Sequence, residues 1–204
     1  MSIILIRHGE TALNVARTFQ PADTPLSARG IAQAGSLARR LAHLGLAGIL
    51  SSDLPRALAT AQYIAAATGL PIVTTALLHE RNFGDLRGLA YDSLGYNPLA
   101  EDAAPPGGES GPDFRRRVAL AFAQAVRMRT MLAGPLAVVT HGLVIRVLLG
   151  TQLLLRAGDH PATHLGNTSV TVVSATAPHA VELLDCTLHL AAGATDNADA
   201  LSGG

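Results

Sequence analysis

The chain has 204 residues, 49% of them hydrophobic and 15% charged, and its 15 basic and 15 acidic side chains give a net charge of zero. These values are typical of a folded globular protein and exclude a fully disordered chain. They also argue against nucleic acid or an anionic membrane surface as a partner, because both favour a strong basic excess.

All the basic side chains are arginine, and the sequence contains no lysine. The absence of lysine excludes a Walker-type phosphate loop, a Schiff-base enzyme and a lysine-bound pyridoxal phosphate. A bias in genomic base composition is enough to explain it. A bound anion would nevertheless have to be held by guanidinium groups, whose forked geometry suits phosphate.

Cys186 is the only cysteine, so the chain cannot form an intrachain disulfide. The apolar run near residue 1 has no basic residue before it and is interrupted by Arg7 and His8. We therefore expect neither a secretory signal nor a membrane-spanning helix here, and we expect a cytoplasmic protein.

The first half of the chain alternates between strand and helix patterns. Ser2–Ile6 is an apolar run rich in isoleucine, which is typical of a buried parallel strand. Ser27 is expected to cap a helix whose apolar positions are Ile31, Ala34, Ala38 and Leu41 and whose C-terminal glycine is Gly45. The pattern then predicts a strand at Leu46–Leu50, a helix at Asp53–Thr68 closed by Gly69, and a short strand at Pro71–Thr74.

The second half begins with an irregular segment. Between Arg81 and Pro112 the periodicity is lost among glycines and prolines, and one helical turn is expected near Tyr91. Residues 191–204 are small and polar, and we expect them to be disordered. The elements predicted between these two segments are a helix at Asp113–Leu132, a strand at Leu136–Thr140, a helix from Leu143, and strands at Thr168–Ser174 and Ala180–Leu184.

Strands that alternate with helices predict a single domain, residues 1–190, with an α/β fold. We expect a three-layer α/β/α sandwich whose sheet is mostly parallel and has helices on both faces. In such sheets, ligands bind outside the carboxyl ends of the strands. Polar clusters follow three of the predicted strands at that edge: Arg7-His8, Ser51-Ser52-Asp53 and His141-Gly142.

The first of these clusters continues as Arg7-His8-Gly9-Glu10-Thr11, and Asn14 lies three residues further on. A histidine between an arginine and a glycine at a strand end can expose its imidazole while the guanidinium and nearby amides bind an anion. An isolated histidine is more often structural, but a run of this kind favours a functional site.

The chain resembles a known family in this cluster and in an ordered series of further motifs. It is similar to the histidine phosphatase superfamily, the phosphoglycerate mutase-like proteins, from residue 3 to about residue 174. The resemblance implies the phosphoglycerate mutase-like form of the predicted fold. The further motifs are Asp23-Thr24-Pro25-Leu26-Ser27 with Gly30, Ser51-Ser52-Asp53-Leu54-Pro55-Arg56-Ala57, Glu80 before Phe83-Gly84-Asp85, Pro106-Gly107-Gly108-Glu109-Ser110, Val139-Thr140-His141-Gly142 and Asn167-Thr168-Ser169.

Phosphoryl transfer needs a nucleophile, cations around the phosphoryl oxygens and a proton for the leaving group. The resemblance assigns the nucleophile to His8, which would be transiently phosphorylated, and the general acid and base to Glu80. The other matching residues are the clamp on the phosphoryl oxygens, Arg7, Arg56 and His141, and the further substrate contacts Asn14, Gln20 and Gly142.

These roles place opposite demands on two pKa values. Guanidinium groups beside His8 should lower its pKa and keep the attacking imidazole neutral. Glu80 must be protonated when the ester arrives, so burial or the incoming dianion should raise its pKa. We therefore expect activity to be highest on the acidic side of neutrality.

The chain departs from the family pattern after Gln20, where Pro21-Ala22 leads directly to Asp23 in a shortened loop. Proline has no amide hydrogen to donate to a phosphate. We therefore expect this edge of the phosphate pocket to differ from that of other family members.

Hydrolysis of a small phosphorylated metabolite, without a cofactor, is the favoured activity. Phosphoglycerate mutase activity is the alternative, but the segment between Glu80 and Glu109 is short and no lysine is present to hold a phosphoglycerate. A catalytically inactive phosphate-sensing or interaction module is a second alternative, although such proteins usually lack one of the core residues. Apolar surface edges also allow a homodimer.

Three other patterns have a plain and a functional interpretation. His160 and His164 have the spacing of metal ligands, but Pro161 lies between them, so we favour a polar loop and activity without a metal. Arg115-Arg116-Arg117 favours a charged helix face over a second anion site. The irregular segment is expected to wall the leaving group. Its candidate substrate contacts are Arg81, Arg87, Tyr91 and Tyr96, and an ordinary solvated loop is an equal alternative for these four residues.

Overall fold

The computed structural model describes residues 1–159 and 164–190 of the chain. Within these residues, six strands form one sheet in the order β3-β2-β4-β1-β5-β6. The strands are β1 (Ser2–Arg7), β2 (Gly48–Ser51), β3 (Ile72–Thr74), β4 (Leu136–Thr140), β5 (Val170–Ser174) and β6 (Val181–Cys186). The α-helices are α1 (Ala12–Val15), α2 (Ala28–Leu41), α3 (Pro55–Thr68), α4 (Gly111–Thr130) and α5 (Gly142–Thr151), and the 3₁₀ helices are η1 (Ala76–Leu78), η2 (Gly84–Leu86) and η3 (Tyr91–Ser93).

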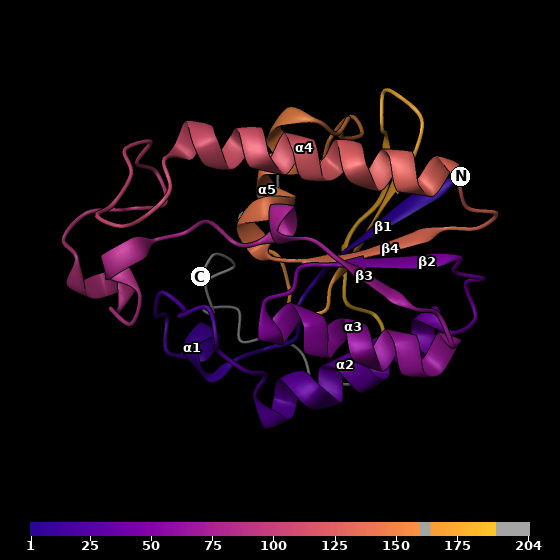
Figure 1. Cartoon of the computed structure of the whole chain (residues 1–204), viewed down its shortest axis with the longest axis horizontal. Coiled ribbons are helices and arrows are strands. Elements are labelled where there is room, and N and C mark those ends of the chain that lie inside the picture. Colours follow the sequence, from indigo (N-terminus) through magenta and orange to yellow (C-terminus); the bar gives the residue numbers. More distant parts are fainter. Residues whose placement is uncertain (160–163, 191–204) are drawn as a thin grey trace.

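Figure 1 shows the sheet between two layers of helices, with α4 and α5 over one face and α2 and α3 over the other. β1 contributes to both layers, because successive residues of a strand point to opposite faces of the sheet. Ile3 and Leu5 pack in the cluster that includes α4 and α5, whereas Ile4 and Ile6 pack in the cluster that includes α2 and α3. The central strand is therefore covered on both faces.

The predicted α/β/α sandwich with a mostly parallel sheet is confirmed. β1, β2, β3 and β4 pair in parallel with one another, and β5 and β6 add two antiparallel pairs at one side. The proposal that residues 1–190 form one domain stays a prediction. The segment 191–204, expected to be disordered, lies outside the described residues.

The helix α2 shows where the sequence pattern was right and where it was wrong. Ser27 caps it as predicted, with Gly30 N donating to Ser27 Oγ (3.0 Å). Ile31 was expected on the buried face, but it is 45% exposed, because the buried stripe runs through Gly30, Ala34, Leu37, Ala38 and Leu41 instead. The helix ends at Leu41, so Gly45 lies in the following turn rather than at the helix terminus.

Two helix starts and one short helix also differ from the prediction. α3 begins at Pro55 rather than Asp53, since proline suits the first helical position, where no amide donor is needed. α4 begins at Gly111, with Ser110 as its cap, two residues before the predicted Asp113. The four-residue helix α1 was not predicted, because it is too short to show a periodicity.

The carboxyl ends of β1, β2 and β4 lie side by side at one edge of the sheet. The register pairs Arg7 with Thr140 and Ser51 with Val139, so the residues that follow these strands are brought together. The irregular segment after Arg81 (magenta in Figure 1) extends from the end of the molecule opposite the N-terminus. In the part of the chain that the structure describes, no helix is both long and apolar enough to cross a membrane.

Candidate active site

The predicted polar clusters meet at this edge of the sheet. His8 follows β1 and donates its amide to Thr140 O (3.0 Å), and Ser52 follows β2 and donates its amide to Val139 O (2.9 Å). His141 follows β4, and its ring centroid lies 5.1 Å from that of His8. The strand register therefore places the two histidines in one site.

The loop after β1 is fixed by neighbours from three parts of the chain. Gly9 N donates to Thr60 Oγ1 of α3 (3.0 Å), and Asn167 Nδ2 donates to His8 O (2.9 Å). Gly30 of α2 packs against the same loop, where an added Cβ would lie 2.0 Å from Glu10 O. A side chain at position 30 would therefore displace the loop that carries His8.

The His8 ring has one defined tautomer when it is neutral. Its Nδ1 lies 2.7 Å from Gly9 O, and since a carbonyl oxygen can only accept, Nδ1 carries the proton. Nε2 then keeps its lone pair. The pKa of His8 is held well below its ordinary value, first by burial and then by the charges of Arg56 and Arg7. The predicted direction is confirmed, but burial outweighs the guanidinium charges, and the ring is only 1% exposed rather than open to solvent.

Two arginines lie close to His8, and both are 1% exposed. Arg7 donates to Leu165 O, and Arg56 Nη1 donates to Pro21 O (3.4 Å). Burial lowers the pKa of Arg56 to about 10, an effect that the nearby Glu80 opposes. Pro21, expected to alter this edge of the pocket through its missing amide, contributes its carbonyl to Arg56 instead.

His141 precedes α5 as its N-terminal cap residue. Its Nε2 lies 2.9 Å from Ser52 Oγ, while its buried Nδ1 has no hydrogen-bond partner among residues 1–159 and 164–190. The pKa of His141 lies well below its ordinary value, first because of burial and next because of Arg56. One ring nitrogen of a neutral histidine is thus available to a ligand.

Glu80 lies in the chain between η1 and η2, and it is 5% exposed. Its carboxylate accepts hydrogen bonds from Arg81 N (3.1 Å) and from Leu143 N (3.2 Å) in the first turn of α5. Burial raises its pKa, although the Leu143 hydrogen bond and the charge of Arg56 partly oppose this shift. The upward direction predicted from the sequence is confirmed.

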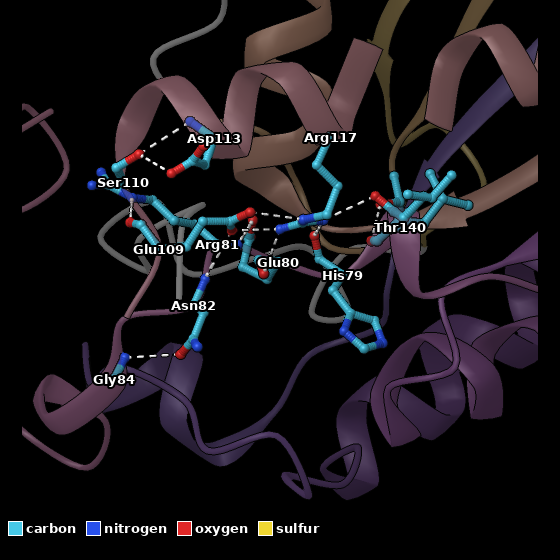
Figure 2. A network of polar contacts seen from close by, with 12 residues as sticks. His79, Glu80, Arg81, Asn82, Gly84, Glu109, Ser110, Asp113, Arg117 and Thr140 are labelled. Carbon is cyan, nitrogen blue, oxygen red and sulfur yellow. Dashed lines mark hydrogen bonds and ion pairs between the residues drawn. The ribbon is translucent and has the colours of Figure 1, made fainter. Parts of the chain in front are cut away.

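Figure 2 shows a network around Glu80 that the sequence did not reveal, with Arg117 reaching from α4 towards His79 and Glu80. Arg117 Nη1 donates to Leu77 O (2.9 Å) and His79 O (2.8 Å), and its Nη2 donates to Glu80 O (3.3 Å). Glu109 holds the same guanidinium with two hydrogen bonds (2.9 and 2.7 Å). Arg117 therefore fixes the backbone that carries Glu80.

The expectation of a charged helix face at Arg115-Arg116-Arg117 is right for only two of the three residues. Arg115 and Arg116 form exposed ion pairs with Asp102 and Asp113. Arg117 instead turns inward, because the acid that neutralises it, Glu109, lies beside the chain at Glu80. Three successive arginines gave no sequence signal to tell them apart.

A cavity of about 520 Å³ opens beside these residues, and Glu80 is the one core residue that lines it. The irregular segment supplies part of the wall, and that it encloses the leaving group stays a prediction. The lining residues are Ala22, Leu54, Ala76, His79, Glu80, Asn82, Arg87, Gly108, Glu109, Asp113 and Arg117. The cavity has room for a leaving group larger than the phosphoryl group itself.

A family model described as the histidine phosphatase superfamily (branch 1) matches residues 3–184. The chain belongs to this superfamily. The resemblance seen in the sequence motifs is therefore confirmed.

Similar proteins include both mutases and phosphatases by name. Over 183 residues the chain is 37% identical to "Probable phosphoglycerate mutase GpmB" of Yersinia pestis (strain Pestoides F), which covers 85% of this chain and 84% of that protein. The structure of a mycobacterial glucosyl-3-phosphoglycerate phosphatase has a TM-score of 0.76 at 29% identity and covers 91% of this chain and 98% of that one. A phosphoserine phosphatase mutant from Entamoeba histolytica, in complex with phosphoserine, has a TM-score of 0.76 at 26% identity and covers 93% of this chain and 99% of that one.

In this histidine phosphatase superfamily member, the further matching residues mainly support the loop that carries His8. Asn14 Oδ1 accepts from Thr11 N (3.0 Å) and completes the cap of α1. Gln20 Oε1 accepts from Thr11 Oγ1 (2.8 Å). Gly142 is the buried first residue of α5, next to His141. Contact of these three residues with a substrate stays a prediction.

The metal-site alternative has no support in the described residues. His160 lies outside them, and among residues 1–159 and 164–190 no three His, Cys, Asp or Glu side chains form a group that could hold a metal ion. Activity without a metal stays a prediction.

Proposed function

We propose that this protein is a phosphomonoester hydrolase that works through a phosphohistidine on His8. The observation that carries the proposal is the state of the His8 ring. Its Nδ1 proton is bound to Gly9 O, which leaves the Nε2 lone pair for attack. Burial and two neighbouring guanidinium groups keep the ring unprotonated near neutral pH.

In the first step, Nε2 of His8 attacks phosphorus, and the bond between phosphorus and the ester oxygen breaks. Arg7 and Arg56 neutralise the charge of the phosphoryl oxygens, and His141 donates a hydrogen bond to them. His141 can accept from Ser52 at Nε2 and donate from Nδ1, which has no other partner among the described residues. Glu80, whose pKa is raised by burial, gives its proton to the leaving alcohol.

In the second step, water attacks the phosphohistidine. Glu80, now ionised, takes a proton from this water, and the bond between phosphorus and Nε2 breaks. Phosphate leaves, and His8 and Glu80 return to their starting states. The raised pKa of Glu80 suits both transfers, because a carboxyl group with a pKa nearer to neutrality can give and take a proton at similar cost.

The substrate we propose is a small phosphorylated metabolite, handled without a cofactor. Support comes from the named activities of similar structures, a glucosyl-3-phosphoglycerate phosphatase and a phosphoserine phosphatase. The cavity beside Glu80 is where the leaving group would lie.

Phosphoglycerate mutase activity is the second candidate, because the Yersinia relative carries that name at 37% identity. Against it stand the absence of lysine and the short segment between Glu80 and Glu109. Efficient interconversion of the two monophosphoglycerates, with little release of phosphate, would establish the mutase instead. An inactive binding module is the least supported candidate, since all five core residues are present in the sequence and lie in one site.

The direct test is release of phosphate from p-nitrophenyl phosphate by the wild type and by His8→Ala. We expect hydrolysis by the wild type, inhibition by vanadate, no effect of EDTA and no activity in the variant. Complete loss of activity in EDTA that zinc restores would reject the metal-free mechanism. Equal activity in both proteins would reject the role of His8.

A further inference from the structure

The cavity beside Glu80 is lined by two arginines and a histidine, and two of these three side chains have an acidic partner within the fold. Arg117 pairs with Glu109 (2.7 Å), and His79 pairs with Asp53. The third is Arg87, whose side chain forms no hydrogen bond or ion pair with any residue in 1–159 or 164–190.

The acidic residues of the cavity do not balance Arg87 either. Glu109 is held by Arg117, and Asp113 is held by Arg116 (2.5 Å) and by Ser110 Oγ (2.6 Å). Glu80 is buried, and burial raises its pKa, which disfavours the ionised form that could pair with Arg87. Among the described lining residues, Arg87 is thus the cation without a counter-charge.

The backbone at Arg87 is fixed although its side chain is exposed. Arg87 N donates to Gly84 O (3.1 Å), and Gly88 N donates to Phe19 O (2.7 Å). Gly84 has a φ of 52°, and an added Cβ would lie 2.0 Å from Pro106 O, so the two halves of the irregular segment are in close contact here. A guanidinium on a fixed backbone costs less entropy to immobilise on a ligand than one on a mobile loop.

The other three candidate substrate contacts in the irregular segment are used elsewhere. Arg81 is 6% exposed and donates to Pro98 O, Ala103 O and Glu109 O, so it holds the segment together. Tyr91 is buried against Phe19, with ring centroids 4.0 Å apart. Tyr96 is exposed and lines other hollows than the one beside Glu80. Only Arg87 of these four borders that cavity.

Arg87 lines the same cavity as Glu80. Its charge acts on Arg56, one of the two guanidinium groups beside His8. A substrate whose phosphoryl group lies at His8 has its ester oxygen at Glu80, so the remainder of the leaving group extends into the cavity towards Arg87.

We infer that Arg87 determines specificity by binding a second anionic group, a carboxylate or a second phosphate, on the leaving group of the substrate. The inference rests on the proposed hydrolase function. A guanidinium fork matches the oxygen geometry of both groups. Neutral leaving groups would bind in the same cavity without this contact.

The test compares matched substrate pairs in the full-length protein. One pair is 3-phosphoglycerate against glycerol 3-phosphate, which differ by a carboxylate, and the other is fructose 1,6-bisphosphate against fructose 6-phosphate, which differ by a phosphate. Phosphate release gives kcat/KM for each substrate in the wild type, in Arg87→Gln and in Arg127→Gln. Arg127 is a control that removes the same charge from the exposed last turn of α4.

We expect the wild type to prefer the anionic member of at least one pair, and the pair that shows this preference identifies the anion. In Arg87→Gln that preference should fall roughly three- to tenfold, a modest change because the pair is solvent-exposed. Arg127→Gln should keep the wild-type preference, and Arg87→Lys should recover part of it.

Hydrolysis of p-nitrophenyl phosphate, whose leaving group carries no second anionic group, reports on folding and on the proposed function. If Arg87→Gln hydrolyses it normally and keeps the wild-type preference, the role of Arg87 is refuted while the hydrolase function stands. A wild type that prefers the neutral member of both pairs also refutes it. A wild type that hydrolyses none of these esters refutes both proposals.

Discussion

Burying His8 and His141 makes the stability of the fold depend on pH. Both pKa values lie well below the ordinary histidine value of 6.5, first because of burial. The unfolded chain regains the ordinary value. Above this pH both states are neutral and the fold has its full stability. As pH falls below it, the unfolded chain binds protons that the folded chain does not, so the free energy of unfolding decreases.

For one such histidine the decrease is about 1.4 kcal/mol per pH unit once the pH is well below the ordinary pKa. Between about pH 8 and pH 5, His8 should therefore account for a loss of up to about 2 kcal/mol in the free energy of unfolding. The substitution His8→Gln removes this loss. Glutamine cannot take up a proton, and its amide can still donate to Gly9 O, as Nδ1 of His8 does.

Urea unfolding followed by far-UV circular dichroism measures this effect, since the chain contains no tryptophan. Over that pH range the free energy of unfolding of the wild type should fall by up to about 2 kcal/mol more than that of His8→Gln. The control Ile64→Val, in a fully buried position, should lower the free energy of unfolding by about 1 kcal/mol at every pH, so that its curve against pH keeps the wild-type slope. Parallel curves for the wild type and His8→Gln would refute the account of His8 as a buried, neutral imidazole.

Glu80→Gln should lower kcat/KM, which reports the phosphorylation step, by roughly 10²- to 10⁴-fold for alkyl phosphates but much less for p-nitrophenyl phosphate, whose leaving group needs no proton, and equal losses would exclude a general acid. The same variant should lose the alkaline limb of the pH-rate profile, because the raised pKa of Glu80 means that activity falls as pH rises through it. Arg117→Met should lower kcat roughly tenfold or more, and, as in Glu80→Gln, the loss should be larger for alkyl than for aryl esters. The variant Arg116→Met, at an exposed position, should keep wild-type rates. Gly30→Ala should destabilise the fold by about 1–3 kcal/mol and also reduce kcat, because its Cβ meets Glu10 O in the loop of His8, and unchanged thermal unfolding would contradict this.

The layers of the fold could be predicted because each long element has a clear sequence pattern. β1 and β4 are continuous apolar runs, and α2 and α3 carry their own start and stop signals at Ser27, Pro55 and Gly69. The short helix α1 could not be predicted, since it depends on a local exchange of hydrogen bonds between Thr11 and Asn14. Ile31 was misplaced because the prediction followed hydrophobicity, whereas the helix turns the small residue Gly30 towards the loop of His8.

The core residues could be assigned because the motifs that carry them follow strand ends, and parallel strands bring those ends together. The supporting residues could not be assigned in this way. Arg117 lies among three arginines of identical type, and only the position of Glu109 turns it towards Glu80. Arg87 was one of four equal candidates, and the packing of Arg81 and Tyr91 distinguishes it. Such differences arise from contacts across the fold, which a single sequence does not encode locally.

Phosphorylation of His8 is the central claim, and intact-protein mass spectrometry tests it most directly. The protein is mixed with excess substrate and quenched into alkali within the first turnovers. Its intact mass is then measured before and after mild acid treatment. The wild type should carry one phosphoryl group that survives alkali and is lost in acid, and His8→Ala should carry none. A wild type that turns over substrate without a phosphorylated form, or a His8→Ala protein that is phosphorylated equally, would contradict the mechanism.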